Sequence, residues 1–144
     1  MPHNGVMKEE ISSILEDIPP GIFIDSTYGY GSHFETIINH NQLTPIGFDR
    51  DLDAVNNSDR SHDVFHLNFS KISDYVEENS LTPISGVLYD LGVSSHQIDT
   101  PSRGFSFSSD ANLDMRMNQK DKLTAEKVLN CLLYTSPSPR DTRE

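Results

Sequence analysis

Four short apolar runs, separated by segments with helical spacing, constrain the fold of this chain more than any other feature. The runs are GIFIDS (21–26), PIGFD (45–49), DVFHLN (63–68) and GVLYDLGV (86–93). The segments between them favour helices near 32–39, 51–56 and 71–78. Strands that alternate with helices imply β-α-β units and a parallel sheet. We therefore predict an α/β, doubly wound fold.

Further helices are expected near the two ends. Residues 7–16 place four apolar side chains at helical spacing, and residues 122–133 do the same. The fourth run is nearly all apolar, which is typical of a strand buried on both faces. The segment 94–121 is polar and rich in Gly and Ser, so we expect it to be irregular.

Composition excludes several classes of protein. The 144 residues include 22 acidic and 11 basic side chains, for a net charge of −11. Nucleic-acid binders usually carry a basic footprint, so the total charge argues against one. Most basic residues follow position 102, however, which leaves room for a local contact surface there. The single cysteine excludes a disulfide framework and multi-cysteine metal sites.

Hydropathy predicts a soluble cytosolic protein. No stretch approaches the ~20 apolar residues that span a bilayer. The polar N-terminus MPHNGVMKEE also lacks the apolar centre of a signal peptide. We therefore expect no membrane contact.

A glycine loop and a second acid indicate a nucleotide-type ligand. The first strand ends at Asp25 and leads through Gly29 and Gly31 into a helix. Such glycines allow a tight turn and a close approach of the backbone to a ligand, and the helix start offers free N–H groups. Asp49 ends the second strand, where a carboxylate can accept ribose hydroxyls. The alternatives are an ordinary turn and an exposed acid that caps the next helix.

The loop favours S-adenosylmethionine over a dinucleotide. A dinucleotide loop would prefer a third glycine three residues after Gly31, and Phe34 stands there. The loop N–H groups could meet the methionine carboxylate, and Asp49 could meet the ribose. Asp90 closes the fourth predicted strand and should project into the same crevice.

Two long strings then point to a family. YDLGVSSHQID (89–99) and RGFSFSSDANLDMRM (103–117) resemble the signature of the bacterial family that methylates N4 of a cytidine in 16S ribosomal RNA. The loop DSTYGYGSH and the strand end GFDRD fit the same family. Residues 2–10 resemble its N-terminal His-x-Pro-Val-Leu box, with departures at Asn4 and Gly5. The resemblance covers residues 3 to about 130.

The resemblance implies a Rossmann-like class I methyltransferase that uses S-adenosyl-L-methionine. The implied partner is 16S rRNA in the small ribosomal subunit, with a possible homodimer in the full-length parent. Its target amine is a poor nucleophile that must be oriented toward the methyl group. The base must also leave any stack to be reached.

The cofactor residues implied by the resemblance follow its motifs. The family's Gly-Gly-His becomes Gly31, Ser32 and His33, with Ser32 in place of a glycine. Asp49 matches the ribose-binding acid, and Asp90 and Gln97 match residues that flank the cofactor and acceptor. Phe69 matches an aromatic near the adenine, although periodicity alone would place it in the core. Asp90 is the candidate catalytic residue. Its ionised carboxylate only accepts hydrogen bonds, so it could accept one from the target amine.

Several other side chains have two interpretations. Arg103 and Arg116 could bind RNA phosphates or form salt bridges within the loop that contains Asp114. Phe105 and Phe107 could stack on a base, but core packing is the favoured interpretation. His96 stands where the family usually has a proline, and a lone loop histidine is most often solvated.

The resemblance also implies an organisation for the chain. Residues 1–100 would form the cofactor-binding half-domain, and 101–130 would begin a helical substrate-recognition insert. Residues 131–144 resemble a non-native read-through tail, with a genuine disordered tail as the alternative. Four of seven strands are expected, so the chain is interpreted as a fragment with an exposed apolar edge.

Two other functions remain open on the sequence alone. One is a non-catalytic nucleotide-binding or S-adenosylmethionine-binding remnant of a Rossmann-like domain. The other is a methyltransferase that acts on a small molecule or a protein, against which the match at 103–117 argues.

Overall fold

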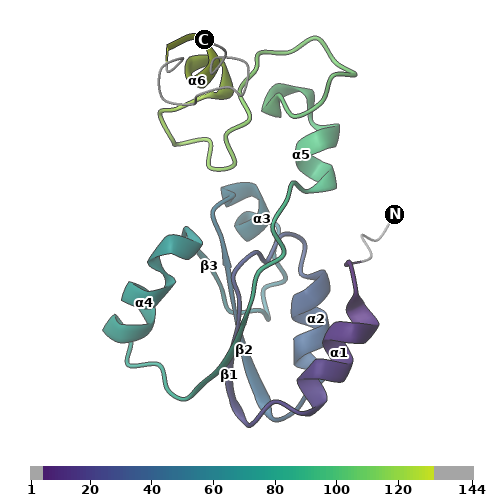
Figure 1. The fold of residues 1–144 in the computed structure, drawn as a ribbon, viewed down its shortest axis with the longest axis vertical. Helices are drawn as coiled ribbons and strands as arrows, with labels where there is room; N and C mark the ends of the chain where they lie inside the picture. Colours follow the sequence, from purple (N-terminus) through teal and green to yellow (C-terminus); the bar gives the residue numbers. More distant parts are fainter. Residues whose placement is uncertain (1–4, 132–144) are drawn as a thin grey trace, which may run out of the picture. The chain divides into compact units, whose positions relative to one another are not determined.

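A computed structural model describes residues 5–131 of the chain. Their contacts divide them into two compact units, with the boundary between Gly92 and Val93. The first unit contains a parallel sheet with strand order β3-β2-β1-β4 (Figure 1). Its strands are β1 (Gly21–Asp25), β2 (Leu43–Asp49), β3 (Val64–His66) and β4 (Ile84–Leu88). The predicted four-stranded parallel sheet of an incomplete Rossmann-like fold is confirmed.

Helices flank this sheet as the spacing predicts. They are α1 (Lys8–Glu16), α2 (Ser32–Ile38), α3 (Leu52–Asn56) and α4 (Ile72–Glu78), with a 3₁₀ turn at Phe69–Lys71. Figure 1 shows α1 and α2 on one side of the sheet and α4 on the other. In the register, Asp25 pairs with Gly47 and with Leu88, and Asp49 pairs with His66. The acids at the strand ends therefore lie along one edge of the sheet.

The core of the first unit has two halves, one on each face of β1. Phe23 packs with side chains of α1 and α2, whereas Ile24 packs with Phe48 and with Ile72 of α4. Successive side chains of a strand point to opposite faces, so these neighbours bury both faces of the central strand. This packing fixes Asp25, the next residue, at the carboxyl end of the sheet.

The fourth strand differs from its prediction. It begins at Ile84 and ends at Leu88, whereas the apolar run predicted a strand over 86–93. The expected burial on both faces was wrong, because no side chain of β4 is fully buried and Val87 is 40% exposed. Asp90 consequently lies two residues beyond the strand instead of closing it.

The second unit contains α5 (Ser95–Asp99), a 3₁₀ turn at Pro101–Arg103 and α6 (Ala125–Cys131). The expectation of an irregular segment over 94–121 therefore missed the short helix α5. Ser94 and Gln97 form a capping box at its N-terminus. α6 begins three residues later than predicted, because the hydroxyl of Thr124 accepts the Lys127 N–H and caps it. The proposed tail lies, beyond Cys131, outside the described residues.

Within residues 5–131, no helix has the length and apolar character that crossing a bilayer requires.

Candidate cofactor-binding site

The glycine loop after β1 turns through two left-handed residues. Gly29 has φ 57° and Gly31 has φ 78°, a region that side chains rarely adopt. The N–H of Gly31 donates to the Tyr28 carbonyl oxygen at 2.8 Å, which closes the turn. A Cβ on Gly31 would also lie 2.8 Å from the Tyr28 hydroxyl oxygen, so both backbone and space require glycine there.

Asp49 ties this loop to β2. Its Oδ2 accepts the Gly29 N–H at 2.8 Å, and its Oδ1 accepts the Asp51 N–H at 2.8 Å. Burial raises the pKa of Asp49, and these backbone hydrogen bonds oppose that rise. Asp51, not Asp49, caps α3 by accepting the Asp53 N–H, so the alternative of an exposed capping acid is wrong. The carboxylate keeps lone pairs that can accept two further hydroxyls.

Asp90 is held beside the same loop. Its N–H donates to Thr27 Oγ1 at 2.7 Å, and its Oδ2 lies 3.6 Å from His33 Nδ1. The Asp90 carboxylate is about half exposed, whereas the His33 ring is buried. Sequence reasoning missed Thr27, whose only signal was its place two residues after the strand-end acid. The predicted proximity of Asp90 to the glycine loop is therefore present.

Asp25 is buried next to this group. Its Oδ1 accepts the Thr27 N–H at 3.2 Å, while its Oδ2 and the Ser26 hydroxyl have no hydrogen-bond partner among the described residues. Burial raises the pKa of Asp25 to about 6, and His33, Asp49 and Asp90 all act on it electrostatically. An orphaned buried oxygen requires an explanation. A proton or a cationic group of a ligand would satisfy it.

A polar chain supports the loop from within the first unit. The buried Tyr28 hydroxyl lies 2.9 Å from His62 Nδ1, and His62 Nε2 lies 3.2 Å from Glu35 Oε1. A carboxylate only accepts, so Nε2 carries the proton in the neutral ring and Nδ1 accepts from the phenol. Burial raises the pKa of Tyr28, which keeps the phenol a donor. No spacing in the sequence links Tyr28 to His62, so this support was not predicted.

The aromatic predicted near the adenine is not a core residue. Phe69 is 39% exposed and meets the exposed ring of Tyr89 edge-on, with centroids 5.9 Å apart. The interpretation from periodicity, which placed Phe69 in the core, is therefore wrong. The pair follows β3 and β4, at the same end of the sheet as Asp25 and Asp49.

Gln97 and Ser32 serve structural contacts. Gln97 lies in the second unit, where its Oε1 accepts the Ser94 N–H at 3.0 Å and its own N–H donates to Ser94 Oγ. Ser32 Oγ accepts the Gly5 N–H at 2.7 Å. The first unit therefore brings together Gly31, Ser32, His33, Asp49 and Asp90, with Phe69 at the same end of the sheet.

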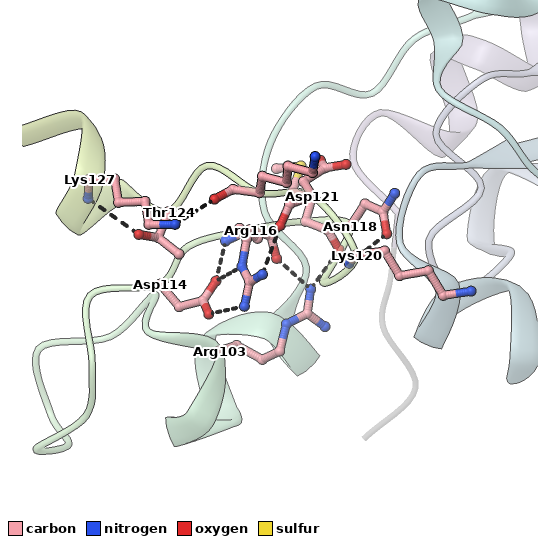
Figure 2. A network of polar contacts seen from close by, with 10 residues as sticks. Arg103, Asp114, Arg116, Asn118, Lys120, Asp121, Thr124 and Lys127 are labelled. Carbon is pink, nitrogen blue, oxygen red and sulfur yellow. Dashed lines mark hydrogen bonds and ion pairs between the residues drawn. The ribbon is translucent and has the colours of Figure 1, made fainter. Parts of the chain in front are cut away.

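The two ends of the string 103–117 meet in one polar network (Figure 2). The buried Arg103 guanidinium donates to the carbonyl oxygens of Arg116 and Met117 at 3.1 and 2.9 Å. Arg116 pairs with both oxygens of Asp114, at 2.8 and 2.7 Å, and also donates to the Asp121 carbonyl oxygen. The hydrogen bond from Arg116 holds the pKa of Asp114 below its usual value.

This network gives the arginines a structural role. Arg116 forms the salt bridge that the sequence offered as an alternative to phosphate binding. Backbone bonds complete the network: the Met115 N–H donates to the Arg103 carbonyl oxygen, and the Ala125 N–H donates to that of Asp114. Phe107 is fully exposed, so its interpretation as a core residue is wrong.

Comparison with known proteins finds one family of methyltransferases. The sequence model of the MraW methylase family matches residues 1–136. Three similar curated proteins share the name ribosomal RNA small subunit methyltransferase H. The protein from Karelsulcia muelleri is 37% identical over 137 residues, which are 92% of this chain and 46% of that protein. Those from Caldicellulosiruptor bescii and Flavobacterium johnsoniae are 40% and 41% identical over 136 and 134 residues, each covering 89% of this chain and 44% of the relative. The chain thus spans less than half the length of these relatives.

Proposed function

The chain belongs to the MraW methylase family, and on that premise we propose that it carries the cofactor half of an S-adenosyl-L-methionine-dependent methyltransferase. The proposed substrate is N4 of a cytidine in 16S rRNA of the small ribosomal subunit, in the cytoplasm. The relatives' name supports ribosomal RNA of the small subunit as the substrate. The specific atom and a homodimer of the longer protein are expectations from the resemblance.

The carboxylates around the glycine loop carry this proposal. Asp49 and Asp90 both hydrogen-bond to the loop segment 27–29, and Asp25 is buried beside them. Three acids at one loop repel the pyrophosphate of a dinucleotide and attract a sulfonium and an ammonium group. The orphaned Oδ2 of Asp25 is the observation that fits a cationic ligand most directly.

The residues present fit the proposed cofactor. Asp49 would accept the ribose hydroxyls with the lone pairs that its backbone hydrogen bonds leave. The exposed ring of Phe69 offers the adenine an apolar face. Gly31, Ser32 and His33 would border the methionine part. Gln97 is included on the resemblance alone.

Asp90 would act on the acceptor base. The bound cofactor supplies an electrophilic methyl group on its sulfonium. The Asp90 carboxylate would accept a hydrogen bond from the exocyclic amine and turn the nitrogen lone pair toward that methyl group. As N4 gains the methyl group it must lose a proton, which the half-exposed Asp90 carboxylate would take.

Calorimetric titration of this chain with S-adenosylhomocysteine tests the cofactor assignment. We expect binding by the unchanged chain and a loss of at least about tenfold in Asp49→Ala, because the loop and the ribose share this carboxylate. Asp63→Ala removes an exposed acid before β3 and should bind as the unchanged chain does. Tighter binding of a dinucleotide than of S-adenosylhomocysteine would instead support a nucleotide-binding remnant.

Methyl transfer by the complete protein encoded with this segment tests the substrate. Labelled methyl groups should enter small ribosomal subunits and should not enter an extract of small molecules or proteins. Asp90→Asn should lower the transfer rate more than it lowers cofactor affinity. Labelling of the extract in preference to the subunits would exclude the ribosomal substrate.

A further inference from the structure

We propose that Gly5 and Ser32 form a matched pair that clamps the N-terminal segment onto the glycine loop and holds that loop in its cofactor-binding form. This inference rests on the proposed function, because it assigns positioning residues to the proposed cofactor site. It concerns backbone groups that no motif of the cofactor loop includes.

Two consecutive contacts make the clamp. The Gly5 N–H donates to Ser32 Oγ at 2.7 Å, and the Val6 carbonyl oxygen accepts from His33 Nε2 at 2.9 Å. Two neighbouring residues of the N-terminal segment therefore bind the first two residues of α2, which directly follow the loop and lie 27 positions along the chain. Two adjacent bonds fix the orientation of the segment as well as its distance from the loop.

The space at Gly5 makes its pairing with Ser32 specific. A Cβ on Gly5 would lie 2.7 Å from Ser32 Oγ and 2.9 Å from His33 Nε2, closer than real Cβ contacts. A Cβ at this position would have to displace the Ser32 hydroxyl or the His33 ring, so the space there favours glycine. A side chain at position 5 and a hydroxyl at position 32 therefore compete for one place.

Both members of the pair are departures from the motifs that the chain otherwise resembles. The N-terminal box has proline where Gly5 stands, and the loop motif has glycine where Ser32 stands. Proline has no N–H to donate, and its ring would occupy the space that the Ser32 hydroxyl fills. The two departures compensate each other: the hydroxyl is accommodated only because position 5 is glycine, and the glycine N–H gains an acceptor only because position 32 is serine.

The clamp also reaches the proposed acceptor carboxylate. His33 Nε2 donates to Val6, so Nδ1 is the nitrogen that faces Asp90 Oδ2, 3.6 Å away. A buried ring held at one nitrogen presents the other in a fixed direction. Loosening the N-terminal segment would free His33 and, through it, the position of Asp90.

A double-mutant cycle on the whole chain tests the pairing, with S-adenosylhomocysteine as the calorimetric probe. Gly5→Pro should weaken binding about tenfold, and Ser32→Gly about threefold, because each removes one bond or introduces a clash. The double variant should bind more tightly than the product of the two single losses predicts, because without the Ser32 hydroxyl the proline meets only the His33 ring. Glu9→Ala changes an exposed side chain of α1 that takes no part in these contacts, so it should bind normally.

Losses that multiply in the double variant would overturn the pairing. If the unchanged chain fails to bind S-adenosylhomocysteine, the proposed cofactor is wrong, and the pairing is then decided by hydrogen exchange at the amides of residues 31–33. The same coupling is expected there: exchange is faster in each single variant, and in the double variant it rises by less than the two single effects together. Independent effects on exchange would contradict the clamp.

Discussion

The Gly29 N–H lies 2.8 Å from Asp49 Oδ2, so a side chain at the end of β2 fixes the turn that follows β1. Asp49 therefore acts in the protein before any ligand arrives: it sets the loop and then offers its remaining lone pairs. An acid proposed to bind a ribose is therefore also part of the scaffold. We therefore expect substitution of Asp49 to lower both the stability of the chain and its affinity for the ligand.

Asp49→Ala should lower the free energy of unfolding by about 1–3 kcal/mol at pH 7, because the N–H groups of Gly29 and Asp51 lose their acceptor. Burial of the charge already costs part of what these bonds contribute, as the raised pKa of Asp49 indicates. Urea denaturation measures the change, and Asp63→Ala serves as the control. An unchanged urea midpoint would show that the loop does not depend on Asp49.

Gly31→Ala should destabilise the chain by about 1–3 kcal/mol, because alanine resists a φ of 78° and its Cβ meets the Tyr28 hydroxyl. Tyr28→Phe removes that hydroxyl and should cost about 1 kcal/mol, since His62 loses its donor. The double variant should therefore be more stable than the two losses together predict, when all are measured by urea denaturation.

Gly29→Ala provides the matched control for this pair. Gly29 has φ 57°, but a Cβ there would come no closer than 3.7 Å to its nearest neighbour, the Thr27 carbonyl oxygen. Its loss should add simply to that of Tyr28→Phe. Equal coupling of both glycines to Tyr28 would mean that contact with the hydroxyl is not what requires glycine at position 31.

Asp25→Asn should stabilise the chain at neutral pH. Burial raises the pKa of Asp25 from 3.8 in the unfolded chain to about 6 in the folded chain. At a pH between these two values the folded state therefore binds more protons than the unfolded state. Stability from this group is fully present below pH 3.8 and is lost as the pH rises through about 6. Keeping the carboxylate ionised in place then costs about 3 kcal/mol, an upper value for the gain from asparagine.

Urea denaturation from pH 4 to pH 7.5 measures this effect. The advantage of Asp25→Asn over the unchanged chain should grow with pH and nearly vanish at pH 4, while Asp63→Asn should show no such trend. S-adenosylhomocysteine should bind the more stable variant less well, because a neutral amide attracts the ligand's ammonium group less than a carboxylate does. An advantage that is constant with pH would contradict the burial of an ionisable carboxyl.

Features carried by neighbouring residues were predictable from the sequence. The strands β1 to β3, the helices between them and the acids at strand ends follow from local hydropathy and turn chemistry. The end of β4 was not predictable, because the apolar run continues to Val93 while pairing with β1 stops at Leu88. Hydropathy indicates which residues favour burial, but it does not show where strand pairing stops. Among the described residues, no strand pairs with the outer side of β4.

The contacts that position the site join residues far apart in sequence. Thr27 meets Asp90, Tyr28 meets His62 and Gly5 meets Ser32, and none of these pairs follows a helical or strand period. The motif resemblance identified Asp90 as a match and Ser32 as a departure, but it gave neither residue a contact partner. Their partners come only from the fold, which places the N-terminal segment and the segment after β4 against one loop.

The arginines of the second unit supply the last prediction, which separates architecture from RNA contact. Arg103→Ala should cost about 1.5–3 kcal/mol locally, because it removes a buried charged donor from two carbonyl oxygens. Arg116→Ala should have a smaller effect, since its ion pair with Asp114 is partly exposed. Hydrogen exchange at the amides of Met115 and Ala125 reports both.

Lys120→Ala is the control for these two variants, because Figure 2 shows the Lys120 ammonium extending away from Asp114. It should leave exchange at both amides unchanged. The structural role predicts that exchange rises in the order Lys120, Arg116, Arg103. If Arg116→Ala leaves exchange unchanged but weakens binding of the complete protein to small ribosomal subunits, Arg116 is an RNA contact. A side chain whose only role is to bind phosphate does not slow amide exchange in the free chain.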